Sequence, residues 1–173
     1  HPLEEKDFSR ITADAYAAEW KYDGIRVQLV HNAIGKALFT RTGDDIGHAF
    51  PDVLARMNFH GTIDGELLVK HDDIIGSFNE LQQRLNRKNP TAKLIADYPT
   101  SIMAYDALFL DDRDIRSLPY DNRRDLLAKA LESHQPASMA LSPQIPFTCF
   151  NDLVTARDTC AGEKIIEGLM LKR

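Results

Sequence analysis

The amino-acid sequence predicts an α+β domain with largely antiparallel sheets flanked by helices. Two observations lead to this prediction. Segments with the two-residue period of strands dominate the start of the chain, and strands then mix with helices without a regular β-α-β alternation. The chain has 173 residues, of which 43% are hydrophobic, and this length is enough to bury the core of one compact domain.

The clearest strand lies at residues 25–30, where three aliphatic side chains alternate with two polar ones. A short polar link at 31–35 leads to a second strand at 36–41, and this order predicts an antiparallel hairpin. Further strand segments are expected at residues 16–21, 63–69, 101–110 and 164–172.

Helical spacing of apolar residues predicts helices at residues 50–57, 78–85, 126–131 and 151–161. Ser77 and Glu80 have the spacing of a capping box at the start of the second helix. Asn151 is the expected N-cap of the fourth helix, and Gly162 is expected to end it. The proline-containing stretch 134–146 is predicted to be a long connection.

The net charge of −5 excludes a protein whose whole surface binds nucleic acid, because such binding needs concentrated lysine and arginine. Any contact with nucleic acid is therefore expected to be local. The best candidate is a run of four cations, with a solvated helix end and loop as the equal alternative. The run consists of Arg84, Arg87, Lys88 and Lys93.

The sequence lacks a stretch near the roughly 20 consecutive apolar residues that span a bilayer, and its N-terminus lacks a signal-peptide pattern. We therefore expect no membrane partner and a cytoplasmic location. Cys149 and Cys160 have neither zinc-site nor disulfide spacing, so both are expected to be reduced, buried thiols. The histidines are scattered singly and receive no role.

The most informative segment is Glu19-Trp20-Lys21-Tyr22-Asp23-Gly24-Ile25-Arg26. It places Lys21 at the end of one expected strand and just before a turn into the next, where its side chain can project into a cleft. A lysine that attacks a phosphate must be neutral, so such a site has to be desolvated or to contain a nearby cation. The K-x-D-G pattern alone is weak, since Asp23 and Gly24 could simply form a hairpin turn.

Four further segments follow in order: Arg41-Thr42-Gly43, Asp64-Gly65-Glu66, Tyr105-Asp106, and Glu167-Gly168-Leu169-Met170-Leu171-Lys172. With the Lys21 segment, they resemble the motifs of the covalent nucleotidyltransferases, the superfamily of ATP-dependent DNA ligases, RNA ligases and mRNA capping enzymes. The resemblance spans residues 19–172, nearly the whole chain. The segment Tyr105-Asp106-Ala107-Leu108, followed by Leu118-Pro119 and Arg123-Arg124, resembles DNA ligases more than capping enzymes.

The resemblance implies an ATP-grasp-like nucleotidyltransferase core and a role for each matching residue. Lys21 would be the catalytic nucleophile that carries AMP. The expected nucleotide-binding residues are Glu19, Trp20, Arg26, Arg41, Glu66, Tyr105 and Lys172. Glu66 and Glu167 would also hold Mg²⁺ or Mn²⁺. Plain alternatives remain, because Glu19 could be an ordinary strand acid, the arginines could lie on the surface, and Tyr105 could be a core aromatic.

The implied reaction is the transfer of AMP from ATP to Lys21, then to the 5′-phosphate of a nick, which the adjacent 3′-hydroxyl seals. Residues 1–173 are expected to be a fragment of the adenylation domain that lacks the last lysine motif, the oligonucleotide-binding-fold domain and any DNA-binding domain. Nicked double-stranded DNA would then be bound through the full-length enzyme, expected to be a monomer in the bacterial cytoplasm or nucleoid. The alternatives are an RNA ligase, a capping-type nucleotidyltransferase, or a non-catalytic nucleotide-binding module.

Overall fold

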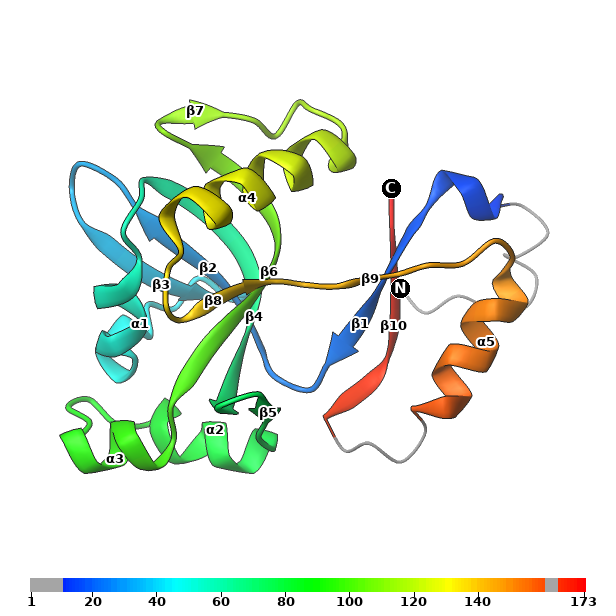
Figure 1. Cartoon of the computed structure of the whole chain (residues 1–173). Coiled ribbons are helices and arrows are strands. Elements are labelled where there is room, and N and C mark those ends of the chain that lie inside the picture. The colour runs from blue at the N-terminus through cyan, green and yellow to red at the C-terminus, as the bar shows by residue number, and fades with distance from the viewer. Residues whose placement is uncertain (1–10, 161–164) are drawn as a thin grey trace. The chain divides into compact units, whose positions relative to one another are not determined.

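The structure is a computed structural model that describes residues 11–160 and 165–173 (Figure 1). In chain order the elements are η2 (Ala13–Ala15), β1 (Ala17–Tyr22), β2 (Ile25–His31), β3 (Lys36–Thr40), η3 (Gly47–Ala49), α1 (Pro51–Arg56), β4 (Gly61–His71), β5 (Ile74–Ile75), α2 (Phe78–Leu85), α3 (Ala92–Asp97), β6 (Thr100–Leu110), β7 (Arg113–Asp114), α4 (Tyr120–His134), β8 (Met139–Leu141), β9 (Gln144–Ile145), α5 (Phe150–Thr159) and β10 (Ile166–Lys172). Across these ranges no helix is both long and apolar enough to cross a membrane.

The described residues form two compact units. That residues 1–173 are one fragment of an adenylation domain stays a prediction. The larger unit is Asp23–Ser142, and the smaller unit joins the chain up to Tyr22 with the chain from Pro143 onward. Within the described ranges, the larger unit has a seven-stranded sheet with the order β3-β2-β4-β6-β7, where β5 pairs with β4 and β8 with β6. The smaller unit has a three-stranded sheet with the order β10-β1-β9.

Both sheets are largely antiparallel, as predicted. The hairpin of β2 and β3 is confirmed, with a register that runs from Val27 opposite Thr40 to His31 opposite Lys36. The pairing of β6 with β8 is parallel. The mixture of antiparallel strands and helices confirms the predicted α+β class.

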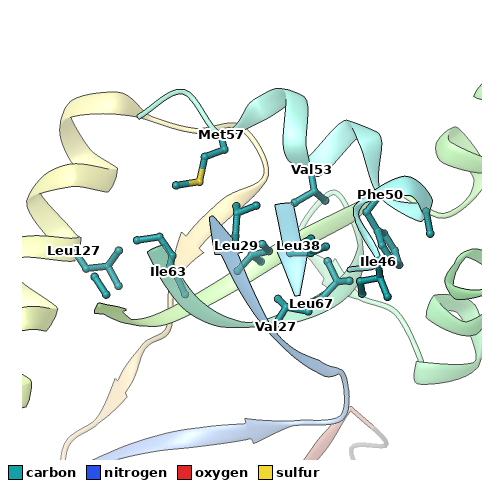
Figure 2. Close-up of a cluster of buried hydrophobic side chains, with 14 of the residues drawn as sticks. Val27, Leu29, Leu38, Ile46, Phe50, Val53, Met57, Ile63, Leu67 and Leu127 are labelled. Carbon is teal, nitrogen blue, oxygen red and sulfur yellow. The ribbon is translucent and has the colours of Figure 1, made fainter. Parts of the chain in front are cut away.

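The core of the larger unit lies between one face of its sheet and the helices α1 and α4. Figure 2 shows Val53 of α1, and Met57 directly after the end of α1, facing Leu29 and Leu38 of the sheet. Burial of each such aliphatic side chain contributes about 1.5–3 kcal/mol. The buried residues of this cluster include Val27, Leu29, Leu38, Phe50, Val53, Met57, Ile63, Leu67 and Leu127. Because successive strand residues face opposite sides, the polar residues between them lie on the other face of the sheet.

The capping box at the start of α2 is confirmed. The Glu80 carboxylate accepts hydrogen bonds from the Ser77 backbone N–H at 2.7 Å and from the Ser77 hydroxyl at 3.0 Å. The stretch 134–146 is more than a connection, because it contains the short strands β8 and β9. The one-and-a-half-turn helix α3 was not predicted.

The predicted N-cap of α5 is wrong by two residues. The helix begins at Phe150, and its N-cap is Cys149 rather than Asn151. The Asp152 carboxylate accepts hydrogen bonds from the backbone N–H groups of Thr148 and Cys149, at 2.8 and 3.1 Å.

Cys149 is exposed, so the expectation of a buried thiol is wrong there, while Cys160 is half-buried. The predicted stop at Gly162 lies outside the described residues.

Arg84, predicted as part of a cationic nucleic-acid contact, is instead a core residue. Its side chain is fully buried and forms an ion pair with Asp52. Its guanidinium also donates to the Thr100 hydroxyl at 3.1 Å and lies over the Phe50 ring, 4.8 Å from the ring centre. A guanidinium enclosed in this way is not available to a phosphate. The other three cations of the run are exposed.

Candidate active site

Lys21 is the penultimate residue of β1 and lies opposite Gly168 of β10. The two strands are antiparallel, so residues directly opposite each other share a face of the sheet. Glu19 and Lys21 therefore share a face with Met170 and Lys172. On that face the Lys172 ammonium donates to the Glu19 carboxylate, with Nζ 2.9 Å from Oε2.

A β-bulge brings Glu167 to the same face as Lys21. Lys21 pairs with Gly168 but Tyr22 pairs with Ile166, so Glu167 is the extra residue in β10. Simple alternation from Gly168 would turn the Glu167 side chain away from Lys21, and the bulge reverses this direction. The Glu167 carboxylate forms an ion pair with the Lys21 ammonium. Gly168 adopts φ +149°, a conformation that residues with a Cβ rarely adopt.

The two ion pairs of this face differ in their exposure to water. The side chains of Lys21 and Glu167 are 49% and 44% exposed, whereas those of Lys172 and Glu19 are 16% and 1% exposed. An exposed pair contributes at most about 1 kcal/mol to stability, while loss of one partner from a buried pair is costly. The Lys21 pair is therefore accessible to a ligand, and the Glu19 pair stabilises the sheet that presents it.

The Trp20 side chain, also predicted to bind the nucleotide, does not share the face of Glu19 and Lys21. It lies opposite Leu169, between Glu19 and Lys21, so its side chain faces the other side of the sheet. Nucleotide binding by Trp20 stays a prediction, and a contact through its backbone would agree with it.

In the larger unit, neighbouring strands bring Arg26 and the Asp64-Gly65-Glu66 segment together. Arg26 of β2 lies directly opposite Glu66 of β4, and its Nη2 donates to Asp64 Oδ2 at 2.8 Å. The second carboxylate oxygen of Asp64, Oδ1, is buried and has no hydrogen-bond partner among the described residues. A buried oxygen without a hydrogen-bond partner lowers the stability of the folded state unless a ligand or an ion binds it.

Gly65 allows β4 and β6 to approach each other between the two acidic residues. A Cβ at this position would lie 2.5 Å from Ile102 Cγ2 and 2.9 Å from the Met103 carbonyl oxygen. The glycine is therefore required by packing, and it leaves Asp64 and Glu66 on the face opposite the core.

Tyr105 lies beside this acidic segment in a bulge of β6. The register changes from Asp64 opposite Asp106 to Gly65 opposite Ala104, which leaves Tyr105 as the extra residue. The pKa of Arg26 is raised, first by its hydrogen bond to Asp64, against a lowering by desolvation, and further by electrostatic interaction with Tyr105 and Glu66. Tyr105 and Glu66 thus lie close enough to Arg26 to contribute to its raised pKa.

Arg41 lies in the turn that follows β3 and is exposed. The turn is closed by hydrogen bonds from Thr40 N–H to the Asp44 carbonyl at 2.9 Å and from Gly43 N–H to the Thr40 carbonyl at 3.0 Å. Gly43 has φ +90°, which explains a glycine two residues after the arginine. Within residues 11–160 and 165–173 the Arg41 guanidinium has no hydrogen bond or ion pair, so it is available to an anionic ligand.

The predicted metal ligands Glu66 and Glu167 belong to different units. In the described part of the chain, no three or more histidine, cysteine or acidic side chains gather into a metal site. The carboxylates of Glu66 and Glu167 are of the ligand type that suits Mg²⁺, which is often held by one or two carboxylates together with phosphate oxygens. The orphaned Asp64 Oδ1 adds a carboxylate oxygen in the unit that contains Glu66.

Sequence reasoning named Glu66 but gave no role to Asp64, or to the Asp106–Arg123 ion pair beside Tyr105. Asp64 stood inside a recognised motif, so the signal for it was present. The pairing of Asp106 with Arg123 joins a strand to a helix 17 residues later, and neither position indicates its partner.

Comparisons with known proteins agree with this arrangement. Residues 3–173 match the family model described as ATP dependent DNA ligase domain. A probable DNA ligase of Opitutus terrae is 43% identical over 135 residues, which are 71% of this chain and 13% of that protein. A probable DNA ligase of Koribacter versatilis is 31% identical over 128 residues, 72% of this chain and 22% of that protein. The chain therefore spans less than a quarter of the length of these relatives.

Solved structures show the same fold. The ligase domain of M. tuberculosis LigD superimposes with a TM-score of 0.73 at 23% identity, over 96% of this chain and 51% of that one. The ATP-dependent DNA ligase of bacteriophage T7, in complex with ATP, has a TM-score of 0.67 at 20% identity, over 98% of this chain and 60% of that one. These likenesses confirm the predicted nucleotidyltransferase core, and with the family match they show that the chain belongs to the ATP-dependent DNA ligase domain family.

Proposed function

We propose that this chain is the adenylyl-transfer part of an ATP-dependent DNA ligase. The Lys21 ammonium first loses a proton to water, and its neutral Nζ then attacks the α-phosphorus of ATP. The new N–P bond replaces the bond to the bridging oxygen, pyrophosphate leaves with the electron pair of that bond, and the second proton lost from Nζ passes to water. The product is lysyl-AMP. The observation that carries this proposal is the accessible Lys21–Glu167 pair, which the bulge at Gly168 places on one face of a sheet.

The smaller unit supplies the nucleophile and three further charged groups in this proposal. Glu167 orients the Lys21 ammonium and accepts its hydrogen bond before attack. The buried Glu19 carboxylate holds the Lys172 ammonium on the same face, where a cation would stabilise charge on the departing phosphates. Glu167 in this unit and Glu66 in the larger unit are each proposed as a ligand of Mg²⁺ or Mn²⁺, which would neutralise phosphate oxygens when bound.

The larger unit supplies nucleotide-binding groups. Nη2 of Arg26 donates to Asp64, and the remaining N–H groups of the guanidinium are assigned to ribose or phosphate oxygens. Tyr105 is buried, with 9% of the residue exposed, and its ring is the group assigned to stacking on the base. Exposed Arg41 offers a cation to a phosphate. The orphaned Asp64 Oδ1 supports a ligand at this place.

AMP would then pass to the 5′-phosphate of a nick in double-stranded DNA, which the 3′-hydroxyl seals. DNA rather than RNA is supported by the names of the matching relatives, which are DNA ligases. This step belongs to the full-length protein, and a monomer in the cytoplasm or nucleoid is part of the proposal. An RNA ligase, a capping-type enzyme and a non-catalytic nucleotide-binding module are the alternatives that the test must separate.

The test is incubation of the protein with Mg²⁺ and either ATP or GTP, followed by measurement of its intact mass. We expect the gain of one AMP with ATP, no GMP with GTP, and no adduct in Lys21→Ala. Lys129→Ala removes an exposed lysine of α4 and should leave the adduct intact. A GMP adduct would favour a capping-type enzyme.

Because the chain spans less than a quarter of the length of these relatives, the same assay is run on the full-length gene product. Absence of an AMP adduct in both proteins would contradict the proposal and favour the non-catalytic module. Sealing of a nicked DNA duplex, compared with a nicked RNA duplex, then separates the two classes of ligase.

A further inference from the structure

Tyr105 differs from its neighbours in β6 because the pairing register between β6 and β4 shifts at this residue. Asp106 lies opposite Asp64 and Ala104 lies opposite Gly65, so Tyr105 is bulged out of the ladder between them. A bulged residue takes the direction of its side chain from local backbone geometry rather than from the regular alternation of the strand. The adjacent paired residues therefore determine where the Tyr105 ring points.

The residue that follows Tyr105 is held by two hydrogen bonds from helix α4. Arg123 Nε donates to Asp106 Oδ1 at 2.8 Å, and Arg123 Nη2 donates to Asp106 Oδ2 at 2.7 Å. The third nitrogen of the guanidinium, Nη1, donates to the Leu118 carbonyl at 2.6 Å. This is the planar, two-bond geometry in which arginine and a carboxylate restrain each other most strongly.

The pair is mostly enclosed, since the side chains of Arg123 and Asp106 are 16% and 18% exposed. The pKa of Arg123 is raised, first by its hydrogen bond to Asp106, with desolvation acting in the opposite direction. The helix that carries Arg123 packs against β6 (Figure 1). Asp106 is therefore attached to a rigid element, and the bulge beside it is restrained on one side.

We propose that Asp106 and Arg123 are positioning residues that fix the direction of the Tyr105 ring for stacking on the base of the nucleotide. This inference rests on the proposed function. The two side chains bond each other and are assigned no part in the reaction itself, so the pair should affect nucleotide binding and not the attack by Lys21. Replacement of Arg123 is expected to raise the KM for ATP about tenfold, the size of a lost base-stacking contact, with kcat changed less than about threefold.

The same unit offers a matched control. Arg116 and Asp114 form a second pair of the same two residue types, with hydrogen bonds of 3.0 and 2.7 Å. Its side chains are 60% and 46% exposed, and neither residue is adjacent to a proposed site residue. Arg116→Met thus removes an equivalent charge and ion pair, and it should leave KM unchanged.

The experiment measures KM and kcat for lysyl-AMP formation in the full-length protein. The variants are Arg123→Met, Arg123→Lys, Asp106→Asn, Tyr105→Ala, Arg116→Met and the double variant Arg123→Met/Tyr105→Ala. If Arg123 acts through Tyr105, the double variant should have the same KM as Tyr105→Ala alone, because there is no ring left to position. Arg123→Lys should have an intermediate KM, since lysine keeps the charge but loses the planar geometry.

Thermal melting of every variant separates a change in KM from unfolding. Asp106→Asn has nearly the same volume as the native residue and replaces Arg123→Met if the latter does not fold. Additive effects of Arg123→Met and Tyr105→Ala would overturn the inference, as would an equal KM in Arg123→Met and Arg116→Met. In both cases the wild-type adduct would leave the proposed function standing, whereas a wild type without any adduct would overturn both.

Discussion

Lys172 and Glu19 are 153 residues apart in sequence, yet the Lys172 ammonium lies 2.9 Å from the Glu19 carboxylate in the smaller unit. They come from the last and the first of the segments that resemble nucleotidyltransferase motifs. Antiparallel pairing of β1 with β10 places both segments on one face, beside Lys21. The pair thus links the structural stability of this sheet to the presentation of the proposed nucleophile.

Lys172→Met should destabilise the protein more than Glu19→Gln does. The Glu19 side chain is almost completely buried, so removal of Lys172 leaves a buried carboxylate without its ammonium partner, at a cost of about 3–5 kcal/mol. In Glu19→Gln the Lys172 ammonium keeps some access to water, so the loss of unfolding free energy is smaller. Urea unfolding of both single variants and of the double variant measures these costs. The double variant should be more stable than Lys172→Met, and strictly additive losses would contradict this account.

Gly168→Ala should impair lysyl-AMP formation through the bulge that directs Glu167 to Lys21. Alanine at φ +149° is strained, and such strain costs on the order of 1–3 kcal/mol or is relieved by a change in the backbone. Relief would remove the bulge and turn Glu167 away from Lys21. We expect the rate of adduct formation, measured by intact mass against time, to fall by at least about tenfold, as for loss of one electrostatic contact at a reacting centre.

Gly35→Ala is the matched control for Gly168→Ala. Gly35 has φ +154° in the exposed turn between β2 and β3, and a Cβ at either glycine would have no atom within 4 Å. Both variants should therefore lose similar stability in thermal melting, but only Gly168→Ala should lose adduct formation. Equal rates in the two variants would show that the bulge does not direct the chemistry.

The longer strands of the larger sheet, β2, β3, β4 and β6, were predictable because each has one buried face. The alternation of Val27 and Leu29 with polar neighbours is a local signal of that burial, and it located β2 within one residue. The strands β8 and β9 have three and two residues, too few to show alternation, and exist because they pair with β6 and β1. Their formation depends on partners that are distant in sequence.

The site was predictable as a set of motif residues and not as a geometry. Period-two alternation would place Glu167 on the face opposite Lys21, and only the backbone of Gly168 reveals the bulge that corrects this direction. Burial of Arg84 likewise depends on Asp52, which is 32 residues away, so the local run of cations indicated a surface that the fold does not provide. A local sequence pattern shows which residue types are present, whereas these contacts depend on residues that are distant in sequence.

Arg84→Met should lower the free energy of unfolding by about 3–5 kcal/mol, because it leaves Asp52 without its cation in a largely enclosed place. Arg87→Met, in the same run of cations, should change it by less than about 0.5 kcal/mol, since that side chain is exposed. Denaturant unfolding followed by circular dichroism compares the two. Similar losses in both variants would mean that the buried ion pair does not stabilise the larger unit.

Glu80 should make stability depend on pH through the start of α2. The pKa of Glu80 lies below its ordinary value of 4.5, first because its carboxylate accepts the Ser77 backbone hydrogen bond and then because of its hydrogen bonds with His71 and the Ser77 hydroxyl. A group whose pKa is lower in the folded state stabilises that state fully above its unfolded pKa, and the stabilisation is lost as pH falls through the folded pKa.

The difference in unfolding free energy between wild type and Glu80→Gln should thus be largest above pH 4.5 and shrink as pH falls through the lowered pKa. Glutamine has no carboxylate to protonate, so the variant lacks this contribution at every pH. Glu132→Gln, at an exposed position of α4, is the control. Its difference from wild type should stay small throughout the urea unfolding series. A Glu80→Gln difference that stays constant down to pH 3 would mean that the charge of Glu80 is not what holds the first turn of α2.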